Sequence, residues 1–156
     1  MKLAILAVGH KPPAWVAAGC AEYVKRMPRE LPLSVIEVKP EPRGSKSREQ
    51  LLAAERTRLL VAMQGCERMV VLDERGVDLP TLKLAERLEG WMRVGGDTAF
   101  VIGGADGVDE TLKRQASECI RLSSLTLPHA LARLILCEQL YRAISIVRKH
   151  PYHREG

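Results

Sequence analysis

The amino-acid sequence predicts a single-domain α/β protein with a mostly parallel sheet, and two observations support that prediction. Short apolar runs alternate with longer amphipathic segments along the whole chain, which is the pattern of strands joined by helices. The 156 residues contain no internal repeat, no low-complexity tract and no long linker. We therefore expect a single domain covering residues 1–156, a size at which a chain can bury a core by itself.

The predicted elements follow one another in a regular order. The apolar runs predict strands near residues 3–8, 33–39, 68–73, 98–102 and 119–122. Helices are expected between them, and the first clear helix start is Ser47, which has Gln50 three residues later as in a capping box. Further starts are predicted at Asp78 or Thr81, on either side of Pro80, and at Asp109 after a glycine turn.

The last predicted helix, from about Pro128 to Lys149, is apolar on more than one side. Its apolar residues are Leu131, Leu134, Ile135, Leu136, Cys137, Leu140, Tyr141, Ile144, Ile146 and Val147. A helix that is apolar nearly all round must be buried all round, and a sheet can cover only one of its faces. We therefore expect a homodimer that forms through this helix. The alternative, a central helix in a monomer, is disfavoured because so short a chain has few other elements to surround it.

Composition, charge and the N-terminal segment together indicate a cytoplasmic protein with a basic surface. Hydrophobic residues make up 46% of the chain and charged residues 28%, which excludes disordered and collagen-like classes. The net charge of +5 favours a polyanionic partner. The apolar segment at residues 1–8 reaches a Gly-His-Lys-Pro-Pro turn too early for a signal peptide. No run approaches the roughly 20 apolar residues of a membrane helix, so no membrane is expected.

The cysteines and the basic loop at residues 40–48 give no sign of a site. The four cysteines are widely spaced and form neither a C-x-x-C pair nor a cysteine-histidine pattern, so reduced thiols and no metal are expected. The cluster from Arg43 to Arg48 could contact phosphate, but a solvated loop is the better interpretation, and its role is left open.

Two loops follow predicted strands at their carboxyl ends, where open α/β sheets bind ligands. The loop at residues 102–107 has paired glycines, which allow a backbone to approach a ligand closely. The loop at residues 122–127 is mildly apolar and ends at Pro128. Backbone donors and acceptors between apolar walls suit a flat heterocycle such as adenine. Neither the first loop nor Gly44-Ser45-Lys46-Ser47 matches a dinucleotide or phosphate-loop fingerprint.

Several motifs together carry a resemblance to a known family. They are Ile102-Gly103-Gly104-Ala105-Asp106-Gly107, Leu122-Ser123, Thr126-Leu127-Pro128-His129, Arg133, Glu138-Gln139-Leu140-Tyr141-Arg142-Ala143 and Pro151-Tyr152-His153-Arg154. The chain thereby resembles the pseudouridine N3-methyltransferases of the ribosomal large subunit, in the SPOUT superfamily. The resemblance runs from Ala7-Val8-Gly9 through Leu72-Asp73-Glu74-Arg75-Gly76 to the tail, and is loose at residues 40–47 and 78–81.

This resemblance implies a fold, a cofactor and a substrate. The fold is a SPOUT-type α/β knot, with a C-terminal trefoil knot and helices on both faces of the sheet. The cofactor is S-adenosyl-L-methionine, held by the knot. The matching cofactor positions here are Leu72, Gly103, Leu122, Ser123, Ser124, Leu125, Thr126 and Leu127. The substrate is a pseudouridine in helix 69 of 23S rRNA, methylated at N3 on the assembled 70S ribosome.

The chemistry of such a transfer directs attention to two histidines and one arginine. Methyl transfer from a sulfonium needs an in-line approach, so positioning supplies much of the acceleration. The N3 proton must also leave, which calls for a base or for a group that stabilises the deprotonated ring. His153 is the first candidate and His129 the second. Arg142 either forms an i,i+4 ion pair with Glu138 or contacts phosphate or cofactor.

The same tail is expected to contact RNA. Tyr152, His153 and Arg154 combine an aromatic face with cationic or hydrogen-bonding groups, which suits stacking and phosphate contacts. His129 is a further candidate. A different class of function, a non-enzymatic ribosome-associated factor, stays open as the alternative. A hydrolase is disfavoured because the sequence has no nucleophile elbow, metal-spaced histidines or paired acidic site.

Overall fold

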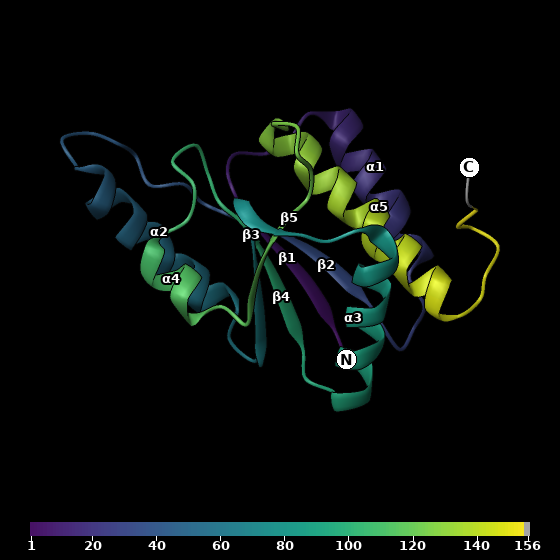
Figure 1. The fold of residues 1–156 in the computed structure, drawn as a ribbon. Coiled ribbons are helices and arrows are strands. Elements are labelled where there is room, and N and C mark those ends of the chain that lie inside the picture. The colour runs from purple at the N-terminus through teal and green to yellow at the C-terminus, as the bar shows by residue number, and fades with distance from the viewer. Residues whose placement is uncertain (155–156) are drawn as a thin grey trace.

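The structure, a computed structural model, describes residues 1–154. Within them a parallel sheet has the strand order β2-β1-β4-β3-β5 (Figure 1). The strands are β1 (Leu3–Val8), β2 (Leu33–Val38), β3 (Arg68–Asp78), β4 (Thr98–Ile102) and β5 (Glu118–Arg121). The predicted α/β class with a mostly parallel sheet is confirmed.

Helices cover both faces of this sheet, as predicted. One face carries α1 (Ala14–Arg26), α3 (Thr81–Val94) and α5 (His129–Val147), and the other carries α2 (Arg48–Ala62) and α4 (Glu110–Gln115) (Figure 1). Side chains alternate between the two faces along each strand. In β1, for example, Ile5 packs toward α1, α3 and α5, whereas Leu6 packs toward α2 and α4. Because helices cover both faces of the sheet, side chains on both sides of a central strand are buried, and this explains the continuous apolar runs in the sequence.

The helix starts predicted at Ser47, Thr81 and Asp109 are correct to within a residue, whereas the alternative start at Asp78 is wrong because Asp78 ends β3. Ser47 and Gln50 form the capping box of α2: the Ser47 hydroxyl accepts from the Gln50 backbone at 3.1 Å, and the Gln50 amide oxygen accepts from the Ser47 backbone at 3.0 Å. The Asp109 carboxylate caps α4. Helix α3 begins at Thr81, directly after Pro80 and without a side-chain cap.

Strand β3 is longer than predicted, because it extends past Asp73 to Asp78. The residues after Leu72 are polar, so their sequence resembles a loop. A break in the register lets β3 pair with β5 a second time, with Val77 opposite Ile120. Gly76 passes so close to this partner that a Cβ there would lie 2.6 Å from the Ile120 carbonyl carbon. The extension therefore depends on a tertiary contact that no local pattern encodes.

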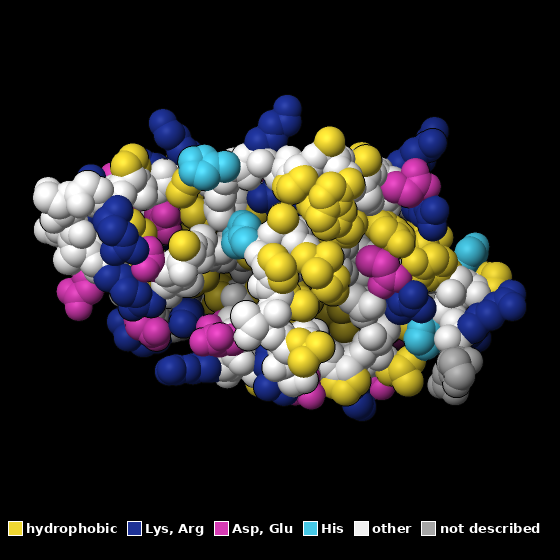
Figure 2. Space-filling view, turned by 90° about the horizontal axis from the view of Figure 1, so that it is seen from above, with side chains coloured by type: hydrophobic (Ala, Val, Ile, Leu, Met, Phe, Trp, Pro, Cys, Tyr) yellow, Lys and Arg dark blue, Asp and Glu magenta, His cyan; other side chains and the backbone are white. Residues whose placement is uncertain are grey.

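Helix α5 lies between α1 and α3 on its face of the sheet (Figure 1). The expectation that a chain this short has few elements to surround the last helix is therefore wrong in part, since α1 and α3 also bury the sides of α5. What remains uncovered is an outer stripe that includes Leu131 and Ile135, both half-buried. Hydrophobic side chains gather over this region in Figure 2. Although α5 has 19 residues, no helix within residues 1–154 is long and apolar enough to cross a membrane.

Candidate cofactor cavity and tail cluster

Three segments, one of them within β3, meet at the carboxyl edge of the sheet around one cavity of about 910 Å³. They follow β4, the first half of β3, and β5, and the first turn of α5 closes the fourth side. Seven of the eight expected cofactor positions line this cavity: Leu72, Gly103, Leu122, Ser123, Leu125, Thr126 and Leu127. Ser124 is exposed and is not among the lining residues. Segments about 50 residues apart in sequence thus form one site because parallel strands end at the same edge.

The loop after β4 is a tight turn that requires glycine. The Gly107 backbone donates to the Gly104 carbonyl at 3.0 Å, and Gly107 has a φ of 83°, a conformation that glycine adopts without steric cost. A Cβ on Gly103 would lie 2.6 Å from the Gly107 carbonyl carbon and 2.7 Å from a Val108 methyl group. The turn therefore closes on itself at Gly103, and the backbone there forms part of the cavity wall.

The basic loop before α2, whose role the sequence left open, holds this glycine turn from outside. The Arg48 guanidinium donates to the Asp106 carbonyl at 2.7 Å, and Arg43 forms an ion pair with the Asp106 carboxylate. Arg56 similarly pairs with Asp109 at 2.9 Å. Arg48 also lines the cavity. Sequence reasoning missed these contacts because their partners lie more than 50 residues away.

The cavity combines apolar walls with charges of both signs. Its charged lining residues are Arg48, Asp73, Glu74, Arg75, Asp106, Glu110, Lys113 and Arg121, four of each sign. Lys113 lies 3.3 Å from Asp73, and the buried Arg121 Nε has no hydrogen-bond partner within residues 1–154. S-adenosylmethionine has a flat heterocycle with hydrogen-bonding edges, two cationic groups and a carboxylate. The donor set therefore fits this cofactor.

His129 lies where α5 meets the cavity. Burial and the positive charge of Arg133 lower the pKa of His129, although the nearby carbonyls of Gly103 and Ile102 oppose the shift. The Nε2 atom is buried and has no partner among the described residues. Arg133 is only 2% exposed and pairs with Glu37 at 3.4 Å. Burial and the Arg133 charge therefore both favour the neutral form of the His129 imidazole.

Arg142, Tyr152, His153 and Arg154 do not line this cavity. Arg142 follows His129 by 13 positions on α5, which at a rise of about 1.5 Å per residue amounts to about 20 Å. The two candidate groups therefore lie at opposite ends of the same helix.

The tail folds back onto α5 and forms a compact polar cluster. Arg142 donates to both oxygens of Glu138, the shortest contact being 2.7 Å, so the predicted i,i+4 ion pair is confirmed. Tyr152 donates its hydroxyl to Glu138 at 2.8 Å, and the Arg142 guanidinium lies 4.8 Å from the centre of the Tyr152 ring. Burial opposes ionisation of Glu138, but the bonds from Arg142 and Tyr152 outweigh it and lower its pKa. The Glu138 carboxylate therefore favours its charged form and joins Arg142 to Tyr152.

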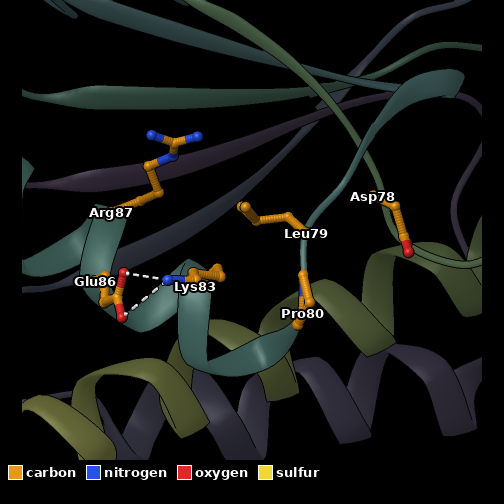
Figure 3. A pocket seen from close by; sticks show the side chains of 6 residues that line it. All are labelled: Asp78, Leu79, Pro80, Lys83, Glu86 and Arg87. Atoms are coloured by element: carbon orange, nitrogen blue, oxygen red, sulfur yellow. Dashed lines mark hydrogen bonds and ion pairs between the residues drawn. The ribbon is translucent and has the colours of Figure 1, made fainter.

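A second cavity, of about 480 Å³, lies at the start of α3 (Figure 3). Its lining residues are Asp78, Leu79, Pro80, Lys83, Glu86 and Arg87. Lys83 pairs with Glu86 at 3.2 Å, and the other two charges pair with residues of β5. No expected site residue lines it, and its charges already have partners. Within residues 1–154 no group of three or more His, Cys, Asp or Glu residues could hold a metal ion.

Comparison with known proteins agrees with this arrangement. The sequence profile of the family described as "Predicted SPOUT methyltransferase" matches residues 1–153. A relative from Dechloromonas aromatica, named "Ribosomal RNA large subunit methyltransferase H", is 68% identical over 156 residues and is covered in full, as is this chain. A relative of the same name from Nitrosospira multiformis is 56% identical over 155 residues, with 99% of each chain covered.

Solved structures share the fold at low sequence identity. A probable methylase family protein from Haemophilus influenzae superposes with a TM-score of 0.57 at 13% identity, over 99% of this chain and 70% of that one. A putative methylase family protein from Neisseria gonorrhoeae gives a TM-score of 0.53 at 14% identity, over 90% and 81%. The profile match and the close relatives both extend over the cavity loops and the tail. The chain belongs to the SPOUT methyltransferase family.

Proposed function

We propose that this chain is an S-adenosylmethionine-dependent methyltransferase that acts in the cytoplasm on N3 of a pseudouridine in helix 69 of 23S rRNA, on the assembled 70S ribosome. The observation that carries the proposal is the convergence of three segments, in β3 and after β4 and β5, on one cavity of mixed charge. The printed name of the close relatives supports an rRNA substrate. The net charge of +5 suits a polyanion. We further propose that residues 1–156 form one domain and that its chain is threaded as a trefoil knot.

The cofactor would bind beside the middle of β3 and at the loops after β4 and β5. The backbone around Gly103 and the apolar loop at residues 122–127 would hold the adenosine, and charged residues of the cavity would face the methionine part. S-adenosylmethionine supplies an electrophilic methyl group on a sulfonium. The residues of this chain then have to bring the nucleophile into line with it and exclude water.

We propose that the protein is a homodimer through the outer stripe of α5. Leu131 and Ile135 are half-buried on this stripe and lie outside the two core clusters. Trp15 of α1, which is 62% exposed, lies one turn from Gly19, and Gly19 packs against Leu134 of α5. An apolar surface that spans two helices is typical of an interface between subunits.

The dimer would also explain why the tail lies far from its own cavity. Two copies of α5 that pack antiparallel about a two-fold axis bring the Arg142 end of one helix near the His129 end of the other. The tail of one subunit would then serve the cavity of its partner. We therefore propose that Arg142, His153 and Arg154 act across the interface.

Replacement of Ile135 by glutamate is expected to convert the dimer to a monomer, because two charges would be buried without partners at the two-fold axis. Sedimentation velocity measures the oligomeric state. The matched control is Val61→Glu, which adds the same charge at an exposed position of α2, on the opposite face of the sheet. A dimeric Ile135→Glu protein would place the interface elsewhere.

The activity itself is tested by transfer of labelled methyl groups from S-adenosylmethionine to unmethylated ribosomes. Label is expected on 23S rRNA of 70S ribosomes, with free 23S rRNA and isolated 50S subunits as parallel samples. Nucleoside analysis then identifies the methylated base and position. Equal labelling of free rRNA would contradict the 70S requirement, and label on no RNA would end the methyltransferase proposal.

A further inference from the structure

One contact in the tail cluster determines the protonation pattern of His153. The Arg142 Nη1 atom lies 3.1 Å from His153 Nδ1. A guanidinium carries only N–H donors and offers no acceptor. The His153 Nδ1 atom must therefore accept, which requires a lone pair on this nitrogen. The ring proton of the neutral imidazole is then on Nε2.

Arg142 is held firmly enough to impose this tautomer. Its Nε atom lies 3.1 Å and its Nη2 atom 2.7 Å from Glu138 Oε2, so two N–H groups of the guanidinium donate to one carboxylate and fix its orientation. The ring of Tyr152 packs against the guanidinium. With Nε and Nη2 engaged by the carboxylate, Nη1 points to His153.

Two tyrosines, Tyr152 and Tyr23, extend the contacts around Glu138. The carboxylate accepts the only proton of the Tyr152 hydroxyl, at 2.8 Å. The hydroxyl oxygens of Tyr152 and Tyr23 are 3.3 Å apart. Since Tyr152 has already donated its proton, Tyr23 of α1 must donate to Tyr152. Tyr152 and Arg142 therefore both donate to the Glu138 carboxylate, and the remaining Arg142 Nη1 donates to the His153 ring.

We propose that His153 acts as a hydrogen-bond donor of fixed tautomer to the reacting base, not as the acceptor of its N3 proton, and that Arg142 is the positioning residue that sets this tautomer. This inference rests on the proposed function. A proton acceptor would need a lone pair on Nε2, and hence a proton on Nδ1, which would face the Arg142 donor. His153 therefore presents Nε2–H.

A donor at this position has a clear chemical role. When N3 of a uracil ring loses its proton to solvent water, the negative charge spreads onto the two carbonyl oxygens that flank N3. A hydrogen bond to one of these oxygens strengthens as the charge develops. The N3–carbon bond then forms as the sulfur–carbon bond breaks, and S-adenosylhomocysteine leaves as a neutral thioether.

The tautomer can be measured directly by ¹⁵N NMR of histidine-labelled full-length protein, without RNA or turnover. Wild-type His153 is expected to show an unprotonated Nδ1 and a protonated Nε2. Arg142→Met should give a mixture of tautomers, and Arg142→Lys, which keeps a donor, should restore the wild-type pattern. A protonated Nδ1 in the neutral wild-type ring would overturn the proposal.

Two substitutions at His153 separate a donor from a proton acceptor. His153→Gln keeps an N–H donor but cannot take up the proton, and is expected to retain methyl transfer to within about tenfold of wild type. His153→Phe has no donor and should lose at least about a hundredfold, the usual effect of removing a donor to a developing anion. Equal loss in both variants would overturn the proposal.

Calorimetric titration of S-adenosylmethionine shows whether each variant still folds and binds, because His153 does not line the cofactor cavity. If wild-type protein transfers no methyl group, the proposed function fails while the tautomer measurement still stands. The two proposals can therefore fail separately.

Discussion

Replacement of Gly103 by alanine is expected to reduce S-adenosylmethionine affinity by about 5- to 150-fold, since a steric clash of this kind costs about 1–3 kcal/mol. The added Cβ would lie 2.6 Å from the Gly107 carbonyl carbon and 2.7 Å from Val108, which is 4% exposed and belongs to the core. One neighbour is backbone and the other is packed, so neither can turn away. The loop at residues 103–108 must shift, and the cavity wall shifts with it. Isothermal titration calorimetry measures the affinity.

Gly90→Ala is the matched control for this substitution. Gly90 lies in α3, and a Cβ added there would meet no neighbouring group of residues 1–154 within 4 Å. Alanine there should leave cofactor affinity unchanged and should stabilise the helix by about 0.5–1 kcal/mol. Chemical denaturation of both variants separates loss of binding from loss of folding. Wild-type affinity in a folded Gly103→Ala protein would mean that the cofactor binds elsewhere.

Truncation after His150 is expected to leave S-adenosylmethionine affinity within about twofold of wild type and to abolish methyl transfer. The tail contacts the Arg142 end of α5 and Tyr23 of α1, about 20 Å from the cavity of its own subunit by the rise of the helix, and it is proposed to present RNA-contacting groups to the partner's cavity. Glu138 and Arg142 remain an ion pair when the tail is removed, so the truncation leaves neither of these charges without a partner. Calorimetry and the ribosome transfer assay measure the two quantities on the same protein.

Truncation after Arg154 is the control for the change in length, because it keeps every tail contact described above. It should transfer methyl groups as wild type does. If truncation after His150 reduced cofactor affinity and transfer equally, the tail would be a structural support of the cavity. If it reduced neither, the tail would have no part in the reaction.

The sequence predicted an element correctly where the interaction that defines it joins residues close together in the chain. The capping box at Ser47 and Gln50 joins residues three apart, and such a pattern can be read directly. The extension of β3 to Asp78 could not be read in this way. It depends on pairing with Ile120, more than 40 residues away, and polar residues there have no strand signal of their own.

The candidate site shows the same division. The glycines at residues 103–107 and the apolar loop at residues 122–127 stood out as ligand loops before any family resemblance was considered. Arg48 and Arg43 did not, because a basic loop of this composition is usually solvated. Their role depends on Asp106, which only the fold brings near.

The sequence by itself determined the alternation of strands and helices, the starts of helices with a local capping signal, and the candidate site residues. These follow from periodicity and from side chains a few residues apart. Only the tertiary structure decided that seven expected cofactor positions share one cavity while Arg142 and His153 lie at the far end of α5. The reason is that strand order and helix length set distances between residues distant in sequence, and no local pattern records them.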